Sequence, residues 1–273
     1  MSRFHTALIL VAAATLASCS VPETRPTTAH AIPVVAPSAI ATPVQSAQDD
    51  NAALLARLQR LAPDADAGVL ALALESRACA ARGAATVPGP RLAVIDYTRP
   101  STQKRLWVFD LQRDVLLYSE HVAHGRGSGE NYATAFSNRD ESHQTSLGLF
   151  STGETYVGGN GYSMRMDGLE PGVNDNARNR LIVMHGAPYV DPAQAQRQGR
   201  LGRSYGCPAL RPQVARAVID ALKQGQMLFA YADEAAWLSG SRYFGCSGRN
   251  AREILASARG MRGGAGNVAT AAR

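Results

Sequence analysis

The sequence has few cysteines, few charges and no long apolar run beyond its first twenty residues. Four cysteines among 273 residues exclude a small scaffold held together mainly by disulfides. Charged residues make up 18% of the chain and the net charge is +6, which argues against a strongly basic nucleic-acid binder. Without a later 18-residue apolar stretch, the mature chain is not expected to span a membrane. A hydrophobic content of 45% is enough for one sizeable core.

The first residues have the pattern of an export signal. Arg3 is followed by an apolar stretch, Ala7 to Leu16, that is too short to cross a bilayer. Leu16-Ala17-Ser18-Cys19 resembles the lipobox of bacterial lipoproteins, which implies removal of residues 1–18 and lipidation of Cys19. An ordinary secretory signal cut nearby would instead leave a soluble protein. We expect a lipoprotein on the periplasmic side of the cell envelope, anchored to a membrane through Cys19.

The rest of the chain is expected to have four parts: a tether, a helical hairpin, a main domain and a tail. Proline, alanine and threonine dominate after Cys19, so residues 19–49 are expected to form a tether. The main domain is expected at residues 90–248. Residues 257–273, rich in Ala, Gly and Arg, are expected to be a disordered tail.

A helical hairpin is expected over residues 50–85, ahead of the main domain. Asp50 stands where an N-cap would, just before leucines at helical spacing. Asp64 or Asp66 could cap the second helix, and Gly83 could end it.

The period changes after residue 90, where short apolar runs separated by polar turns predict consecutive strands of an antiparallel sheet. The runs cover 92–97, 105–111, 115–122, 147–150, 180–184 and 226–231, with a helix at 212–222. Residues 124–180 are rich in glycine and are expected to be mostly loop, and long loops on a sheet usually make a site. The predicted fold class is mainly β (α+β), a sheet or sandwich preceded by the hairpin.

Cys207 and His185 give the strongest chemical signal. Cys207 lies in a glycine-containing turn before the helix expected at 212–222, and amides near a helix N-terminus would lower the pKa of its thiol and stabilise an oxyanion. His185 ends a buried strand, where an imidazole can act as general base and then general acid. The pair suggests acyl transfer, although a lone cysteine is more often a packed core residue.

The residues around this pair resemble a known family. His185-Gly186, a spacer and Ser204-Tyr205-Gly206-Cys207 are similar to the motif of YkuD-type murein L,D-transpeptidases, in the branch with a Gly-Cys-Pro-Ala ending. Further segments between residues 92 and 232 carry the same resemblance. It implies a YkuD-like, mainly β catalytic domain.

The resemblance also implies roles for individual residues. Cys207 would be the nucleophile and His185 its proton partner. The backbone carbonyl of Gly186 would orient the imidazole, and the backbone amides of Gly206 and Cys207 would form the oxyanion site.

The substrate-binding residues are less firmly indicated, because the sequence departs from the widespread family motif. That motif has histidine before the Gly-Cys pair and arginine two positions after the cysteine, where this chain has Tyr205 and Ala209. Arg211 could replace the missing guanidinium. His124 could contact substrate or be a hydrogen-bonded structural histidine. The expected substrate contacts are Ser204, Tyr205, Arg211, His124, Asn138 and Tyr162.

No cofactor and no metal are expected. His121 and His124 have an H-x-x-H spacing with His143 nearby, but no further ligand stands at a recognised spacing and a strand would turn the first two to opposite faces. Cys79 and Cys246 could pair outside the cytoplasm, and the sequence leaves this open.

The expected function is cysteine-dependent transfer on peptidoglycan stem peptides. The resemblance implies a thioester at Cys207, release of a terminal D-alanine and resolution by an amine of a second stem, together with acylation by carbapenems. Hydrolysis of stems or cross-links as an L,D-carboxypeptidase or endopeptidase is one alternative. A catalytically inert peptidoglycan-binding lipoprotein is another. No nucleic-acid partner is expected.

Overall fold

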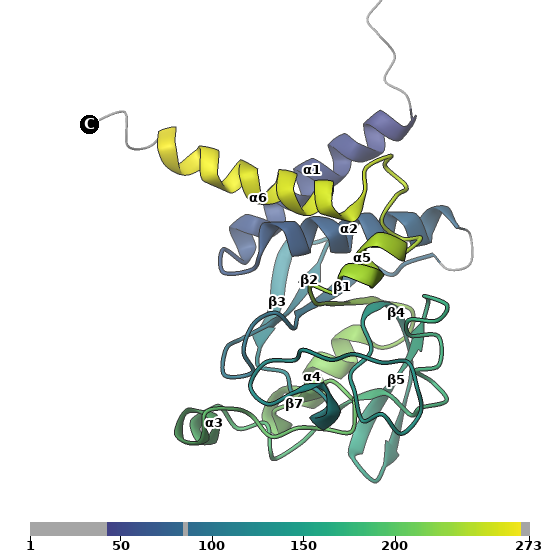
Figure 1. The fold of residues 1–273 in the computed structure, drawn as a ribbon, viewed down its shortest axis with the longest axis vertical. Coiled ribbons are helices and arrows are strands. Elements are labelled where there is room, and N and C mark those ends of the chain that lie inside the picture. Colours follow the sequence, from purple (N-terminus) through teal and green to yellow (C-terminus); the bar gives the residue numbers. More distant parts are fainter. Residues whose placement is uncertain (1–42, 84–86, 269–273) are drawn as a thin grey trace, which may run out of the picture. The chain divides into compact units, whose positions relative to one another are not determined.

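The computed structural model describes residues 43–83 and 87–268, with side chains in 50–83 and 87–261. The expected signal peptide, Cys19 and most of the tether lie outside these residues. Within the described ranges, none of the helices combines the length and the hydropathy that crossing a bilayer requires. The fold consists of a group of helices and one mixed β-sheet (Figure 1).

Three helices, α1 (Pro43–Leu61), α2 (Ala67–Arg82) and α6 (Ala251–Val268), are gathered at the top of Figure 1, above the sheet. The carboxylate of Asp66 accepts the Val69 N–H at 2.9 Å and caps the start of α2, and Gly83 caps its end. Leucines of α1 and α2 share one apolar core with the sheet. The expected helical hairpin is present, and Asp66 rather than Asp64 caps its second helix.

The first helix begins earlier than the sequence suggested. Helix α1 starts at Pro43 rather than at residue 50, so residues 43–49 are helical and not part of a tether. Proline is favoured in the first turn of a helix, because the N–H it lacks would have no partner there. Nothing between Pro43 and Asp50 breaks a helix, since neither glycine nor another proline occurs.

The tail predicted to be disordered from residue 257 is wrong for residues 257–268, which belong to α6. Asn250 and Glu253 exchange side-chain to backbone hydrogen bonds at the start of α6, as in a capping box. Ala251, Ile254 and Ala258 are buried in the common core, and α6 packs on α2. Two of these three residues are alanines. The buried face of α6 therefore lacks the large apolar residues that would have indicated a helix in the sequence.

The sheet contains eight strands. They are β1 (Arg91–Asp96), β2 (Leu106–Asp110), β3 (Val115–Glu120), β4 (Gly148–Gly158), β5 (Gly161–Gly168), β6 (Val183–Gly186), β7 (Ala209–Leu210) and β8 (Met227–Tyr231), with connecting helices η1 (Arg126–Ser128), α3 (Pro192–Gln198), α4 (Pro212–Leu222) and α5 (Ala235–Gly240). Their order is β3-β2-β1-β8-β4-β5-β6-β7. The β1–β8 and β6–β7 pairs are parallel and the others antiparallel. The mainly β class is confirmed, but the sheet is mixed rather than wholly antiparallel.

The β4–β5 hairpin lies in the region that the sequence predicted to be mostly loop. Its strands pair from Phe150 and Gly168 to Gly158 and Gly161 around a two-residue connection. Such turns favour Asn and Gly, so the residues that suggested a loop belong to a hairpin end. Met164 and Met166 are buried at alternate positions of β5 and pack into the core.

Strand β6 carries His185 and lies between β5 and β7, with Ser163 and Ala209 as the two neighbours of His185. The sequence placed this strand at 180–184, but Leu181 is 63% exposed with a φ of 55°, so a turn comes first. A Cβ at Gly186 would lie 3.0 Å from that of Ala215 in α4. Gly186 therefore faces α4, and His185, its neighbour along the strand, faces the opposite side of the sheet.

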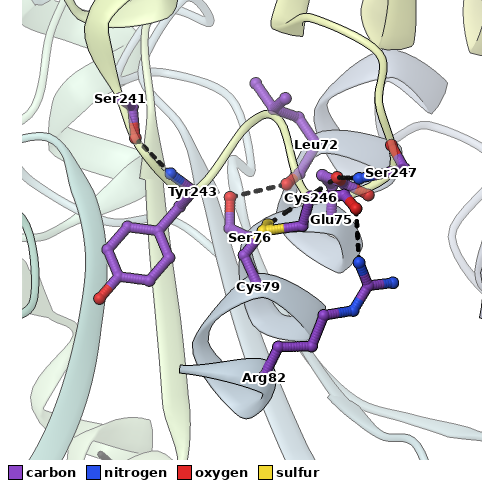
Figure 2. Close-up of a disulfide and its surroundings, with 9 residues drawn as sticks. All are labelled: Leu72, Glu75, Ser76, Cys79, Arg82, Ser241, Tyr243, Cys246 and Ser247. Atoms are coloured by element: carbon purple, nitrogen blue, oxygen red, sulfur yellow. Dashed lines mark hydrogen bonds between the residues drawn. A yellow bond between two sulfur atoms is a disulfide. The ribbon is translucent and has the colours of Figure 1, made fainter. Parts of the chain in front are cut away.

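A disulfide joins Cys79 of α2 to Cys246, which lies between α5 and α6 (Figure 2). The two Cα atoms are 5.5 Å apart and the residues are separated by 167 positions in the sequence. Next to the bond, the carboxylate of Glu75 accepts the Ser247 N–H at 2.7 Å and Arg82 donates to the carbonyl of Cys246. The pairing that the sequence left open is present, and it fastens the C-terminal segment to α2.

Candidate active site

Cys207 lies in a loop that Ser204 holds in shape. The Ser204 hydroxyl donates to the Cys207 carbonyl at 2.6 Å and accepts the Gly206 N–H at 3.1 Å. Gly206 has a φ of 118°, and a Cβ there would lie 2.8 Å from the carbonyl oxygen of Gln144. Only glycine adopts this conformation without strain, so the Ser-x-Gly-Cys spacing is a requirement of the loop itself.

The thiol of Cys207 is unpaired and buried, with 8% of the residue exposed. Its Sγ accepts the Val183 N–H at 3.4 Å and donates to the Leu181 carbonyl at 3.6 Å. Burial raises the pKa of this thiol, while the Val183 N–H and the charge of Arg180 lower it. The net direction is upward, so the resting sulfur is a neutral thiol.

The helix expected after Cys207 is present, but the pKa of the thiol is raised and not lowered. Helix α4 begins at Pro212, and β7 lies between it and Cys207. The expected lowering of the thiol pKa by this helix is therefore wrong. The sequence placed the helix correctly but gave no sign of the two-residue strand in front of it.

His185 is buried, and its ring is fixed from one side. Its Nδ1 lies 3.0 Å from the carbonyl oxygen of Gly186, the contact that the family resemblance implies. Because a carbonyl only accepts, Nδ1 carries the hydrogen and Nε2 of the neutral ring has a free lone pair. Burial lowers the pKa of His185, and the Gly186 carbonyl partly opposes this. The imidazole is thus neutral and able to act as a base at pH 7.

Cys207 and His185 meet at the same short strand but are not hydrogen-bonded to each other. Sγ binds the backbone at Val183, two residues before His185 on β6. Among the described residues, the hydrogen bonds of Sγ go to Val183 and Leu181 and that of the imidazole goes to Gly186. The thiol must therefore leave the Leu181 carbonyl before it can give its proton to the ring.

The expected oxyanion site is only partly available. The Gly206 N–H is already bound to the Ser204 hydroxyl, so it does not point to an incoming carbonyl. The Cys207 N–H lies near its own sulfur and lowers the pKa of that thiol. Of the two predicted amides, the Cys207 amide is the one left to face a reacting group.

Four of the expected substrate contacts are engaged elsewhere: His124, Asn138, Tyr162 and Arg211. His124 is 1% exposed, with Nδ1 accepting from Arg105 at 2.7 Å and Nε2 lying 3.3 Å from the Gly129 carbonyl. Burial is the main cause that lowers the pKa of His124 to about 3. It is the structural histidine that the sequence allowed as an alternative, and a substrate has no access to its ring.

The polar groups of Asn138 and Tyr162 also have protein partners. The Asn138 amide donates to Asp175 at 2.7 Å and accepts the Asn176 N–H at 3.1 Å, which fixes a surface loop. The Tyr162 hydroxyl donates to Asp220 of α4 at 2.7 Å. Tyr162 therefore lies on the α4 side of the sheet, opposite to the side that His185 faces.

Arg211 does not supply a free guanidinium. It donates to both carboxylate oxygens of Glu120, with distances of 2.8 to 3.1 Å, and its charge is neutralised. Tyr205, by contrast, is 63% exposed next to Cys207, between the guanidinium of Arg126 and the ring of His143. Of the six expected substrate contacts, Tyr205 is the one presented on the surface beside the thiol.

Arg180 was not among the site residues expected from the sequence, which placed it in a strand. Arg180 precedes the turn at Leu181 and donates to four neutral oxygens around it. Its charge lowers the pKa of Cys207. Since nothing in the local pattern separates this arginine from the apolar run that follows, only the fold brings it to the thiol.

Possible metal ligands are not gathered in the described part of the chain: no three His, Cys, Asp or Glu side chains are placed to hold an ion together. His121 lies 3.2 Å from the Thr102 carbonyl and His143 packs on Tyr205. The histidines that gave the H-x-x-H spacing each have separate protein partners.

The chain is similar to one protein family and, more distantly, to several solved structures. No curated protein matches the chain. Among solved structures, an L,D-transpeptidase from Mycobacterium smegmatis is 16% identical with a TM-score of 0.33, over 52% of this chain and 59% of that one. One from Stackebrandtia nassauensis is 15% identical with a TM-score of 0.32, over 69% of this chain and 80% of that one.

The alignment thus spans less than two thirds of the length of the Mycobacterium smegmatis protein. A sequence model described as the L,D-transpeptidase catalytic domain matches residues 62–231. This match covers more than half of the chain, begins before α2, and includes both His185 and Cys207. The chain belongs to the L,D-transpeptidase catalytic domain family.

Proposed function

We propose that this protein is a peptidoglycan L,D-transpeptidase that works through a thioester at Cys207. One observation carries the proposal: within the family match, a free thiol binds the backbone of the short strand that carries a neutral, oriented imidazole. The substrate class follows from the family, which acts on peptidoglycan stem peptides.

The acylation step begins with a proton transfer. Since burial raises the pKa of Cys207 and lowers that of His185, the resting pair is a neutral thiol and a neutral ring. The thiol turns from the Leu181 carbonyl and gives its proton to Nε2, and sulfur attacks the carbonyl carbon of the third stem residue. The C–N bond to the terminal D-alanine then breaks, and the imidazolium protonates the departing amine.

The second step returns the thiol. An amine of another stem gives a proton to His185 and attacks the thioester carbonyl, so that a new amide forms and the thiolate leaves and is reprotonated. Water in place of the amine would yield a carboxylate and make the enzyme an L,D-carboxypeptidase. The Gly186 carbonyl keeps Nδ1–H in place through both steps.

The test uses purified protein and tetrapeptide stems, with products separated by mass. We expect cross-linked dimers and free D-alanine from the wild type and neither from Cys207→Ala, whose melting temperature should stay close to that of the wild type. Equal turnover by a folded Cys207→Ala protein would exclude the thioester route.

A second candidate is a catalytically inert peptidoglycan-binding protein. It is favoured by the buried thiol and by the missing hydrogen bond between Sγ and the imidazole. Incubation of purified sacculi with the protein separates the candidates. New dimers indicate transpeptidation, new tripeptides or opened cross-links indicate hydrolysis, and bound protein with an unchanged fragment profile indicates the inert binder.

We also propose that the protein is a lipoprotein on the periplasmic side of the cell envelope. The Leu16-Ala17-Ser18-Cys19 segment supports lipidation, and the Cys79–Cys246 disulfide fits an oxidising compartment. Mass spectrometry of the mature N-terminus should find acyl chains on Cys19, and Cys19→Ala should move the protein from the membrane to the soluble fraction. An unmodified N-terminus beyond Cys19 would contradict the anchor.

A further inference from the structure

The guanidinium of Arg180 is held by neutral groups alone. Four hydrogen bonds go from its two Nη atoms to backbone carbonyls and hydroxyls: Ser137 O, Ser146 Oγ, Ser142 Oγ and Gln144 O. Its Nε is buried and has no hydrogen-bond partner. Arg180 makes none of the ion pairs found among the described residues.

A partly buried cation without a carboxylate is costly, because lost hydration is not replaced by an opposite charge. The nearby Arg178 shows the usual solution, since it is exposed and paired with Glu154 and Asp167. Burial lowers the pKa of Arg180, and the causes that raise it are Asp140 and the sulfur of Cys207. The fold thus places the positive charge of Arg180 near Cys207, a buried group that becomes negative when its thiol loses a proton.

Two backbone connections place this charge beside Cys207. The residue after Arg180 is Leu181, whose carbonyl accepts the thiol at 3.6 Å. On the other side, Arg180 donates at 2.8 Å to the Gln144 carbonyl, the oxygen against which Gly206 packs. The guanidinium therefore fixes both the turn that receives the thiol hydrogen and the loop segment at Gln144 that packs against Gly206.

The other titratable groups around Cys207 do not supply a positive charge. Tyr97 and Tyr189 interact with the sulfur, and burial raises the pKa of both hydroxyls, so they remain neutral. His185 on β6 is neutral at rest because burial lowers its pKa. Arg105 is fully buried, but its donors go to Val122, Arg99 and His124.

We propose that Arg180 is a positioning residue that stabilises the thiolate of Cys207 through its positive charge, which no hydrogen-bonded carboxylate neutralises. This role rests on Cys207 being the reacting group of the proposed function. Proton transfer from the thiol to His185 places negative charge on a buried sulfur, and the guanidinium makes that charge separation less unfavourable. Arg211 cannot take this role, because its charge is neutralised by Glu120, whereas the charge of Arg180 acts on the sulfur.

The test measures ionisation of Cys207 without a stem peptide. Full-length wild type, Arg180→Gln, Arg180→Lys and the control Arg178→Gln are treated with iodoacetamide across pH, and alkylation is followed on the peptide that contains Cys207. We expect the midpoint of the pH profile to rise by about one unit or more in Arg180→Gln. It should return toward the wild-type value in Arg180→Lys and stay unchanged in Arg178→Gln.

An unchanged midpoint in a folded Arg180→Gln protein would overturn the proposal. If Arg180→Gln does not fold, Arg180→Lys decides. A near-wild-type midpoint then supports a role of charge, and a midpoint raised by about one unit or more contradicts it. Alkylation does not require turnover, so failure of the proposed function would appear separately, as missing dimers from a wild type whose thiol still responds to Arg180.

Discussion

Two regions of this molecule use cysteine in opposite ways. At the helices, Cys79 and Cys246 are joined in a disulfide that spans 167 residues. At the β6–β7 end of the sheet, Cys207 is a free thiol whose sulfur, among the described residues, is hydrogen-bonded to the backbone at Val183 and Leu181. The first pair restrains the chain, while the sulfur of Cys207 is not used for a crosslink. The surroundings of each sulfur, not the residue type, decide its use.

The largest effect is expected from replacing His185, the proposed base. This change should lower activity at Cys207 and leave the disulfide-bonded helices unchanged. We expect His185→Gln to lower kcat for tetrapeptide stems by about 10² to 10⁴, because proton transfer to and from sulfur loses its acceptor. Steady-state kinetics with a melting curve as control measures this. Wild-type kcat in a folded His185→Gln protein would contradict the proposal that Cys207 reacts with His185 as its base.

Removing the disulfide should instead lower the stability of the protein and leave its activity nearly unchanged. The double variant Cys79→Ala/Cys246→Ala is expected to lose about 2 to 5 kcal/mol of unfolding free energy, because the unfolded chain is no longer restrained. Its kcat at 25 °C should remain within twofold of wild type, since Cys207 and His185 lie on other elements. Denaturant unfolding and kinetics on the same sample check both; a large fall in kcat without unfolding would show that the two regions are coupled.

Acidification should weaken the interior beside the Cys207 loop through His124. Its folded-state pKa is lowered to about 3, mainly by burial, against an unfolded value of about 6.5. Between these values the unfolded chain binds one more proton, so stability is full above about pH 6.5 and falls by up to about 1.4 kcal/mol per pH unit toward pH 3.

Urea unfolding at pH 7 and pH 5 measures this slope. His124→Gln should show a shallower loss on acidification than wild type. The same slope in both proteins would mean that His124 is not the neutral buried group described here.

The smallest effect is expected at Arg211. Its pair with Glu120 is half-buried, and Arg211→Gln should cost about 1 kcal/mol of stability or less. Because the guanidinium is already neutralised, KM for the stem peptide should change less than twofold. Kinetics at fixed pH tests this, and a tenfold rise in KM would assign substrate-carboxylate binding to Arg211 after all.

Much of the fold could be predicted from local pattern. The strands near residues 92–97, 105–111 and 226–231, the helix at 212–222 and the helical hairpin follow from apolar spacing, because each packs against one shared core. The hairpin of β4 and β5 was missed, since its glycines and polar residues are typical of loops. Helix α6 was missed because small alanines form much of its buried face.

The sequence singled out Cys207 and His185 through a motif, and the structure shows why its glycines are present: a side chain would lie close to Gln144 at Gly206 and close to α4 at Gly186. The catalytic roles of Cys207 and His185 stay predictions. The substrate contacts were not predictable, because Asn138, Tyr162 and Arg211 find their partners in distant segments. The charge of Arg180 acts on the thiol because of the turn at Leu181. No residue pattern in the sequence predicted that turn.

The most direct measurement is the mass of the intact protein after exposure to a carbapenem, followed by digestion to locate the adduct. If Cys207 is the acyl acceptor, the protein gains one carbapenem mass on the peptide containing Cys207. That adduct is slower to form in His185→Gln and absent in Cys207→Ala. A folded wild-type protein that stays unmodified, or one modified at another residue, would contradict the assignment of Cys207 as the nucleophile.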